Sequence, residues 1–171
     1  MNTESVEIVQ LTPEDWQAYR KIRLEALQND PRAFGSSYQE TLTRPDAYWQ
    51  GRLAEAAQGT HSWLLFAREN GVLVGTIGAF LNDARDEAEI IAVYVTPAKR
   101  GRGIANALLE RILQEVQKVP TVRKAVLGVN RSQTAALALY QRFGFQIVEE
   151  INARMGDGKT YDEYLMERPF P

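Results

Sequence analysis

The stretch of this chain best suited to do chemistry is a basic, glycine-rich turn, Lys99-Arg100-Gly101-Arg102-Gly103. It follows an apolar run at residues 90–95 that is typical of a buried strand, and it precedes a helical pattern of apolar residues from Ile104 to Val116. Glycines let main-chain N–H groups approach an anion closely, and the start of a helix adds the positive end of its dipole. This arrangement predicts a binding site for a phosphate or pyrophosphate group.

The spacing of the glycines in this turn indicates which class of phosphate-binding motif it can belong to. The chain has no P-loop, and Asn106 stands where a dinucleotide-binding turn needs its third glycine. An enzyme that uses this turn for ATP or NAD is therefore the weaker alternative. The run from Arg100 to Ala105 instead satisfies the pattern Q/R-x-x-G-x-G/A. At this point the chain resembles the GNAT family of acetyl-CoA-dependent N-acetyltransferases.

A second motif lies downstream of the first, in the order that the family shows. Residues 124–130 (KAVLGVN) predict a short apolar strand that ends in an asparagine. Ser132 is predicted to cap the following helix, which carries Tyr140 and ends at Phe143-Gly144-Phe145. This series of strand, Asn, helix, Tyr and Phe-Gly-Phe resembles the second GNAT signature.

The rest of the sequence predicts the elements that must hold these two motifs in place. We expect strands at 6–11, 62–69, 72–81, 146–153 and 160–167, a helix that begins after the capping box at 12–15, a loop at 32–37 and a second helix from Pro45. This order predicts an α+β protein with a mixed, mostly antiparallel twisted sheet of about seven strands flanked by four helices. It is also the order of the GNAT fold, and we expect one domain that covers residues 1–171.

Composition excludes several classes of protein. The net charge of −2 argues against general attraction to nucleic acid, and the basic cluster is local, as a small anionic ligand requires. With no cysteine and a single histidine, the chain cannot form a cysteine acyl-enzyme or the usual zinc cluster, so we expect no metal. No apolar run approaches the ~20 residues of a membrane span, and we expect a cytoplasmic protein.

The resemblance implies roles for particular residues. The residues implied to bind the CoA pyrophosphate, mainly through main-chain N–H groups, are Arg100, Gly101, Arg102, Gly103, Ile104 and Ala105. Val93 and Val95 would offer main-chain groups to the pantetheine arm, as an extra strand pairs with a sheet edge. Asn130 would hydrogen-bond the pantetheine or its neighbourhood, and Tyr140 would protonate the leaving thiolate.

Acetyl transfer to an amine also needs a general base, because an alkylammonium with a pKa of about 10.4 is protonated at neutral pH. Glu89 is the predicted base, since some family members carry a catalytic Glu within a similar Ala-Glu-Ile run. Strand alternation would place Glu89, Ile91, Val93 and Val95 on one face. An ordered water is the alternative base, with Asp86 and Glu87 as weaker candidates, and Glu89 would then be a solvated acid.

The resemblance places the acceptor pocket between the first two helices and the last strand pair. The residues that this implies are Phe34, Ser36, Ser37 and Tyr38, with Arg23 or Tyr164 as further candidates. The predicted function is transfer of an acetyl group to a primary amine of a small molecule or a peptide N-terminus, directly within a ternary complex. The alternative is a non-catalytic acyl-CoA-binding or regulatory module. The final strands could also support a homodimer.

Overall fold

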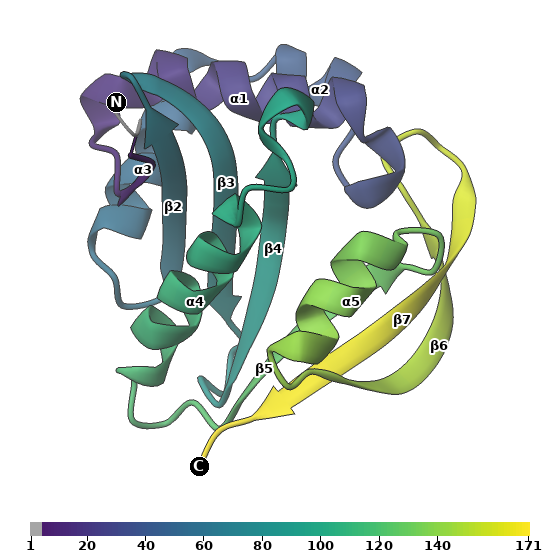
Figure 1. Cartoon of the computed structure of the whole chain (residues 1–171). Helices are drawn as coiled ribbons and strands as arrows, with labels where there is room; N and C mark the ends of the chain where they lie inside the picture. Colours follow the sequence, from purple (N-terminus) through teal and green to yellow (C-terminus); the bar gives the residue numbers. More distant parts are fainter. Residues whose placement is uncertain (1–4) are drawn as a thin grey trace.

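The computed structural model describes residues 5–171, so residues 1–4 of the predicted domain lie outside the described residues. Its centre is a seven-stranded mixed sheet with the strand order β1-β2-β3-β4-β5-β7-β6 (Figure 1). The strands are β1 Glu7–Val9, β2 Ser62–Glu69, β3 Val72–Leu81, β4 Glu87–Val95, β5 Lys124–Asn130, β6 Gln146–Arg154 and β7 Thr160–Pro169. The α-helices are α1 Trp16–Asn29, α2 Tyr38–Leu42, α3 Asp46–Ala57, α4 Ile104–Gln117 and α5 Thr134–Arg142.

These elements confirm the predicted α+β fold and most of its boundaries. The β2–β3 hairpin turns at Asn70 and Gly71, whose φ angles of 50° and 76° suit the two-residue turn that the sequence predicts. The short helix α2 was not predicted. It begins because the hydroxyl of Ser37 accepts a hydrogen bond from the N–H of Glu40, which turns the end of the predicted loop into a capped helical turn.

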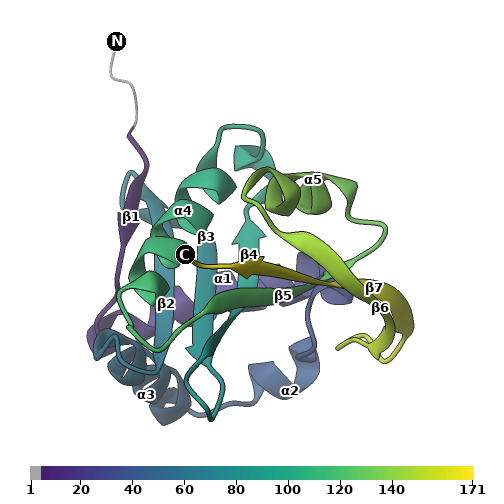
Figure 2. The ribbon, with the colours of Figure 1, turned by 90° about the horizontal axis from the view of Figure 1, so that it is seen from below.

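The helices cover both faces of the sheet and enclose two hydrophobic cores. In Figure 2, α4 and α5 lie on one face, and α2 and α3 lie on the other. The core under α4 and α5 includes Leu108 and Ile112, and it extends from β2 to β7. The second core lies between α1, α3 and the opposite face of β2–β4, where Trp49 and Phe66 are fully buried. The first core therefore joins both halves of the sheet.

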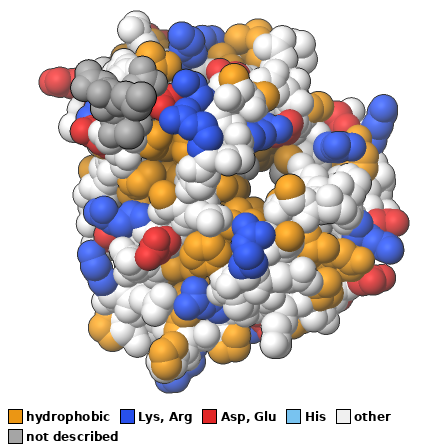
Figure 3. Space-filling model, viewed as in Figure 1, with side chains coloured by type: hydrophobic (Ala, Val, Ile, Leu, Met, Phe, Trp, Pro, Cys, Tyr) orange, Lys and Arg blue, Asp and Glu red, His pale blue; other side chains and the backbone are white. Residues whose placement is uncertain are grey.

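The sheet opens between β4 and β5, which are its only neighbouring parallel strands among residues 5–171. They pair only where Glu87–Glu89 lies beside Lys124–Val126, and beyond these residues the two strands diverge (Figure 1). Figure 3 shows a hollow in the molecular surface at this place, next to α5. The main-chain N–H and C=O groups of this part of β4 that point away from β3 therefore have no neighbouring strand.

A β-bulge bends β4 where the gap opens. Two residues of β4, Ala92 and Val93, lie opposite a single residue of β3, because the pairing steps from Ile91 with Gly78 to Tyr94 with Thr76. Ala92 has a φ of 57°, which is unusual for a residue with a side chain. The bulge turns the end of β4 away from the ideal path of a strand.

Candidate active site

The predicted anion-binding loop adopts the geometry that main-chain recognition of a phosphate requires. Gly101 and Gly103 have φ angles of 77° and 82°, which favour glycine strongly. The first main-chain hydrogen bond of α4 runs from the N–H of Ala107 to the carbonyl of Gly103, 3.1 Å away. The N–H groups of Ile104, Ala105 and Asn106 therefore precede the hydrogen-bonded ladder and form the positive end of the helix.

The basic side chains of this region build the loop through a buried acid, Glu69, at the end of β2. Its side chain is only 2% exposed and contacts the ammonium of Lys99 at 2.7 Å and the guanidinium of Arg102 at 2.6 Å. Hydrogen bonds from Arg102 and then Lys99 lower the pKa of Glu69 to about 2. Glu69 was not predicted, because no local motif links the end of a hairpin strand with a loop so distant in the chain.

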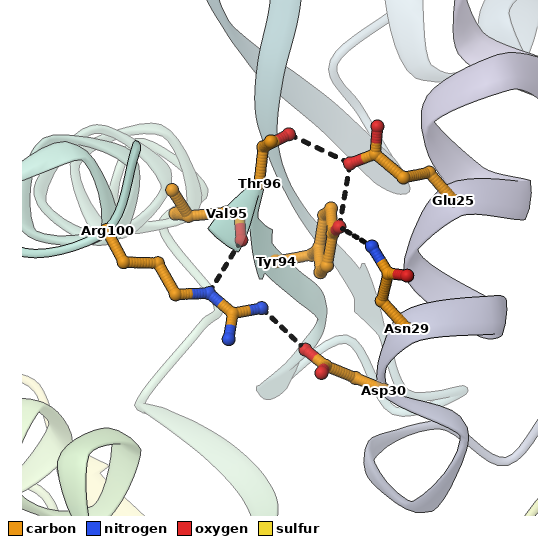
Figure 4. A network of polar contacts seen from close by, with 7 residues as sticks. All are labelled: Glu25, Asn29, Asp30, Tyr94, Val95, Thr96 and Arg100. Carbon is orange, nitrogen blue, oxygen red and sulfur yellow. Dashed lines mark hydrogen bonds and ion pairs between the residues drawn. The ribbon is translucent and has the colours of Figure 1, made fainter. Parts of the chain in front are cut away.

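Arg100 has a comparable structural role on the other side of the loop (Figure 4). Its Nε donates to the carbonyl of Val95 at 2.8 Å, and its Nη2 pairs with the carboxylate of Asp30 at 2.9 Å. Asp30 directly follows α1, so this ion pair attaches the loop to that helix. Two arginines of the predicted anion-binding loop therefore hold its shape, and the groups left for an anion are mainly main-chain N–H groups.

A second part of the same network fixes the end of β4 against α1 (Figure 4). The buried Tyr94 donates its hydroxyl proton to Glu25 at 2.7 Å and accepts a hydrogen bond from Asn29 at 3.0 Å. The hydroxyl of Thr96 also donates to Glu25, at 2.8 Å. Burial, followed by the bond with Glu25, raises the pKa of Tyr94 to about 12.

The bulge corrects the predicted faces of β4. Val93 and Val95 pack into the core under α4, whereas Glu89 lies opposite Phe80 on the face that α1 and α3 cover. The prediction of one shared face was wrong, because the extra residue at the bulge reverses the alternation of side chains. Glu89 has an exposed side chain, and partial burial of its carboxyl raises its pKa.

The main chain of Val95 faces the gap between the strands. The N–H of Thr96 donates to the carbonyl of Val74 in β3, so the main-chain groups of the preceding residue point away from β3. The carbonyl of Val95 already accepts a hydrogen bond from Arg100, while its N–H faces the opening. Val93 is two residues earlier and presents its main chain to the same edge.

Asn130 lies at the end of β5 and is 3% exposed. Its Oδ1 accepts hydrogen bonds from both the N–H and the hydroxyl of Ser132, at 2.9 and 2.7 Å. Ser132 was predicted to cap α5, but that helix begins at Thr134 and Ser132 orients Asn130 instead. The amide Nδ2 of Asn130 is buried without a partner within residues 5–171, which is costly unless a ligand accepts its hydrogen bond.

Tyr140 projects from α5 into the first core, with 5% of its surface exposed. Its ring packs edge to face against Phe145 with centroids 6.0 Å apart. Burial raises the pKa of Tyr140, so its hydroxyl remains protonated at neutral pH. A protonated, rigidly held phenol is suited to donate a proton.

The predicted acceptor residues lie in a loop that also contributes to the second core. Phe34 is 6% exposed, and the guanidinium of Arg23 stacks on its ring at 4.9 Å while donating to the hydroxyl of Ser36 at 3.4 Å. The carbonyl of Phe34 accepts a hydrogen bond from Gly156, in the turn between β6 and β7. Tyr38 begins α2 and is half-buried.

The weaker base candidates have structural partners. Asp86 accepts a hydrogen bond from the amide of Asn82 at 2.7 Å, and Glu87 pairs with Lys124 at 3.2 Å. Tyr164, a further acceptor candidate, packs under the guanidinium of Arg131 at 5.4 Å.

The sheet opens beside the predicted anion-binding loop, and α5, which carries the buried Tyr140, lies next to that opening (Figure 1). Comparison with known proteins identifies the class. Residues 14–145 match the model of the acetyltransferase (GNAT) family, and the chain belongs to that family. It is an acyltransferase.

Sequence and structural relatives agree with this assignment. An uncharacterized N-acetyltransferase of Mycobacterium tuberculosis is 32% identical over 117 residues, which are 68% of this chain and 73% of the relative. An acetyltransferase of the GNAT family from Streptococcus pneumoniae has a TM-score of 0.84 at 22% identity, covering 97% of this chain and 100% of that chain. A putative acetyltransferase from Salmonella typhimurium, solved with acetyl-CoA, has a TM-score of 0.81 at 21% identity, covering 98% and 95%.

Within residues 5–171 no helix is long and apolar enough to cross a membrane. The same residues contain no group of three or more His, Cys, Asp or Glu side chains that could hold a metal ion.

Proposed function

We propose that the protein transfers the acetyl group of acetyl-CoA directly to a primary amine, either of a small molecule or of a peptide N-terminus, within a ternary complex. The observation that carries the proposal is the opening between β4 and β5, which begins beside Glu89 and leads to the glycine loop. Its edge offers main-chain groups of Val93 and Val95, and the unpartnered amide of Asn130 at the end of β5 is available to a ligand.

The cofactor would lie along this opening. The N–H groups at the start of α4 would bind its pyrophosphate, and the free edge of β4 would pair with the amides of the pantetheine arm. The unpartnered Nδ2 of Asn130 supports this placement, because a pantetheine carbonyl would satisfy it. A relative solved with acetyl-CoA has the same fold, which agrees with this choice of cofactor.

The chemistry requires a base and an acid. A base takes one proton from the acceptor ammonium, and the neutral amine then attacks the thioester carbonyl carbon. When the C–S bond breaks, Tyr140 gives its proton to the thiolate and regains one from the acylated nitrogen through solvent. Glu89, or a water that it holds, is the base that the sequence predicts, and its raised pKa agrees with that role.

The alternative is a module that binds acyl-CoA without turnover. The protonated Tyr140 at the opening favours catalysis, because a binding module has no need of a proton donor beside the thioester. The two hypotheses differ in whether any amine is acetylated when the cofactor is bound.

Thermal unfolding with acetyl-CoA, ATP and NAD at equal concentrations tests the cofactor. A ligand at a hundredfold its Kd stabilises the fold by about 2.7 kcal/mol, which for a chain of this size raises the Tm by roughly 5–10 °C. We expect this shift with acetyl-CoA alone. No shift with acetyl-CoA would remove the transferase hypothesis.

Substitution Tyr140→Phe tests the acid. We expect kcat to fall about a hundredfold with acetyl-CoA binding retained, because only the hydroxyl is removed from a packed ring. Tyr161→Phe is the matched control, since that hydroxyl bonds Asp157 in the β6–β7 hairpin. An unchanged kcat in Tyr140→Phe would show that another group protonates the thiolate.

A further inference from the structure

A second acid, Glu163 in β7, lies near the opening and has no role in the predicted site. Its side chain belongs to a residue that is 8% exposed, and within residues 5–171 its carboxylate has no hydrogen bond and no ion pair. The carboxylate is partly buried, and a glutamate so little exposed is seldom left without a partner, because its charge loses part of its hydration. It therefore indicates a ligand that supplies the missing partner.

The backbone directs this carboxylate toward the opening in the sheet. Glu163 pairs with Asn130 across β5 and β7, so the two buried polar residues share one face of the sheet. A Cβ atom added at Gly128 would lie 3.1 Å from Oε1 of Glu163. The carboxylate thus leans over Gly128, toward β4 and away from β6, into space that any other residue at this position would fill.

Glu163 and Glu89 lie on the same face, on opposite sides of the opening. Glu89 pairs with Val126, and alternation along β5 places Val126, Gly128 and Asn130 on that face together. The loop with the predicted acceptor residues borders this face, since Gly156 in the β6–β7 turn donates to the carbonyl of Phe34 at 2.8 Å. The face therefore belongs to the acceptor side, opposite α4 and α5.

The charged and titratable groups around Glu163 leave it without a cation. Strand pairing places six such groups on the same face of the sheet: Glu87 and Glu89 on β4, Lys124 on β5, Glu149 on β6, and Tyr161 and Glu167 on β7. The short helix at residues 31–33, which contacts β5, adds Arg32. Lys124 is already paired with Glu87 and Glu167. Burial raises the pKa of Glu163, and no neighbouring charge lowers it.

We infer that the carboxylate of Glu163, in place of Glu89, binds the ammonium group of the acceptor and accepts its proton before acetyl transfer. This inference rests on the proposed function. One N–H bond of the ammonium breaks, its electron pair stays on nitrogen as the nucleophile, and the proton forms an O–H bond with Glu163. After transfer, the carboxylic acid releases that proton to solvent.

The test compares Glu163→Gln with Glu89→Gln in acetylation assays across pH, using a panel of amino acids, polyamines and short peptides as acceptors. Glu149→Gln is the control, because it removes an exposed acid from the same face on β6. We expect Glu163→Gln to lower kcat/KM about a hundredfold and to remove the acidic limb of the pH profile, with Glu163→Asp restoring part of both. Acetyl-CoA should still raise the Tm of every variant.

Gly128→Ala supplies a second test that keeps the carboxylate. The added methyl group displaces Oε1, so kcat should fall several-fold while the Tm changes little, whereas Gly51→Ala on α3, with nothing near its added Cβ, should leave kcat unchanged. The inference is overturned if Glu163→Gln and Gly128→Ala behave like their controls while acetyl-CoA still binds and the wild type still acetylates. If the wild type acetylates no amine, the proposed function fails first and this inference with it.

Discussion

At the residue scale, Glu69 shows how charged side chains that appear to serve a ligand can instead shape its site. It pairs with Lys99 and Arg102 from a side chain that is 2% exposed. Glu69→Gln would leave two cations without their anion and would loosen the glycine loop. We expect acetyl-CoA to bind about tenfold more weakly, measured by isothermal titration calorimetry, although the substitution adds positive charge near a pyrophosphate. Tighter binding would mean that the arginine contacts the ligand directly.

The contribution of Glu69 to the stability of the fold should depend on pH. Its pKa is about 2 in the folded protein and is lowered from an ordinary value of 4.5, so the folded state favours the ionised form. Its contribution to stability is therefore complete above about pH 4.5 and is lost as the pH falls toward 2. In denaturant titrations the stability gap between the wild type and Glu69→Gln should narrow over that range. A gap that is constant from pH 5 to pH 2 would contradict the assigned ion pairs.

The sequence allowed individual residues to be predicted where a local motif carries them. Gly101, Gly103 and Tyr140 belong to motifs of adjacent residues. Both glycines have positive φ angles and Tyr140 is buried, while their roles in binding and catalysis stay predictions. Glu69 and Glu163 escaped prediction, because their importance depends on partners and neighbours in other strands. Pairing of this kind is determined by the register of the sheet and leaves no local pattern.

At the element scale, the end of α1 holds the bulged end of β4. Tyr94→Phe would remove a hydroxyl that donates to Glu25 and accepts from Asn29, leaving a carboxylate with fewer partners. We expect a loss of about 2 kcal/mol, and hence a Tm lower by roughly 4–8 °C. Differential scanning calorimetry measures this, with Tyr161→Phe as the control, since that tyrosine is half-buried and within residues 5–171 its hydroxyl bonds only Asp157 in the β6–β7 turn. Equal Tm values for both variants would mean that the network contributes nothing to stability.

Elements with strong local signals were predictable, and their distortions were not. The β2–β3 hairpin has the predicted limits, because Asn70 and Gly71 tolerate the positive φ angles of its turn. The bulge at Ala92 was not predicted, since alanine is not a residue type that indicates a positive φ angle. That conformation is held by tertiary contacts, including a hydrogen bond of 2.6 Å from Thr76 to its carbonyl. One unpredicted bulge was enough to place Glu89 and Val93 on opposite faces of the sheet, although the sequence predicted a shared face.

At the scale of the whole molecule, the two halves of the sheet are joined at both ends of the opening. At one end, Arg123 donates its main-chain N–H to the carbonyl of Asp86 at 2.7 Å, and Lys124 pairs with acids of β4 and β7. At the other end, Gly156 in the β6–β7 turn donates to the carbonyl of Phe34, and Figure 1 shows this turn beside the segment that follows α1. The chain therefore closes the opening at both ends.

The close contact at Gly156 allows the effect of a substitution in the β6–β7 turn to be predicted. An added Cβ would lie 1.9 Å from the carbonyl oxygen of Ser36, so Gly156→Ala must push the β6–β7 turn away from the acceptor loop. This separation should cost about 1–3 kcal/mol of stability and raise the KM for the amine several-fold. The KM for acetyl-CoA should change little, because the glycine loop lies in the other half of the sheet. Gly51→Ala, which meets nothing within 4 Å, is the control. If Gly156→Ala raises both KM values equally, the turn supports the whole opening and has no particular connection with the acceptor side.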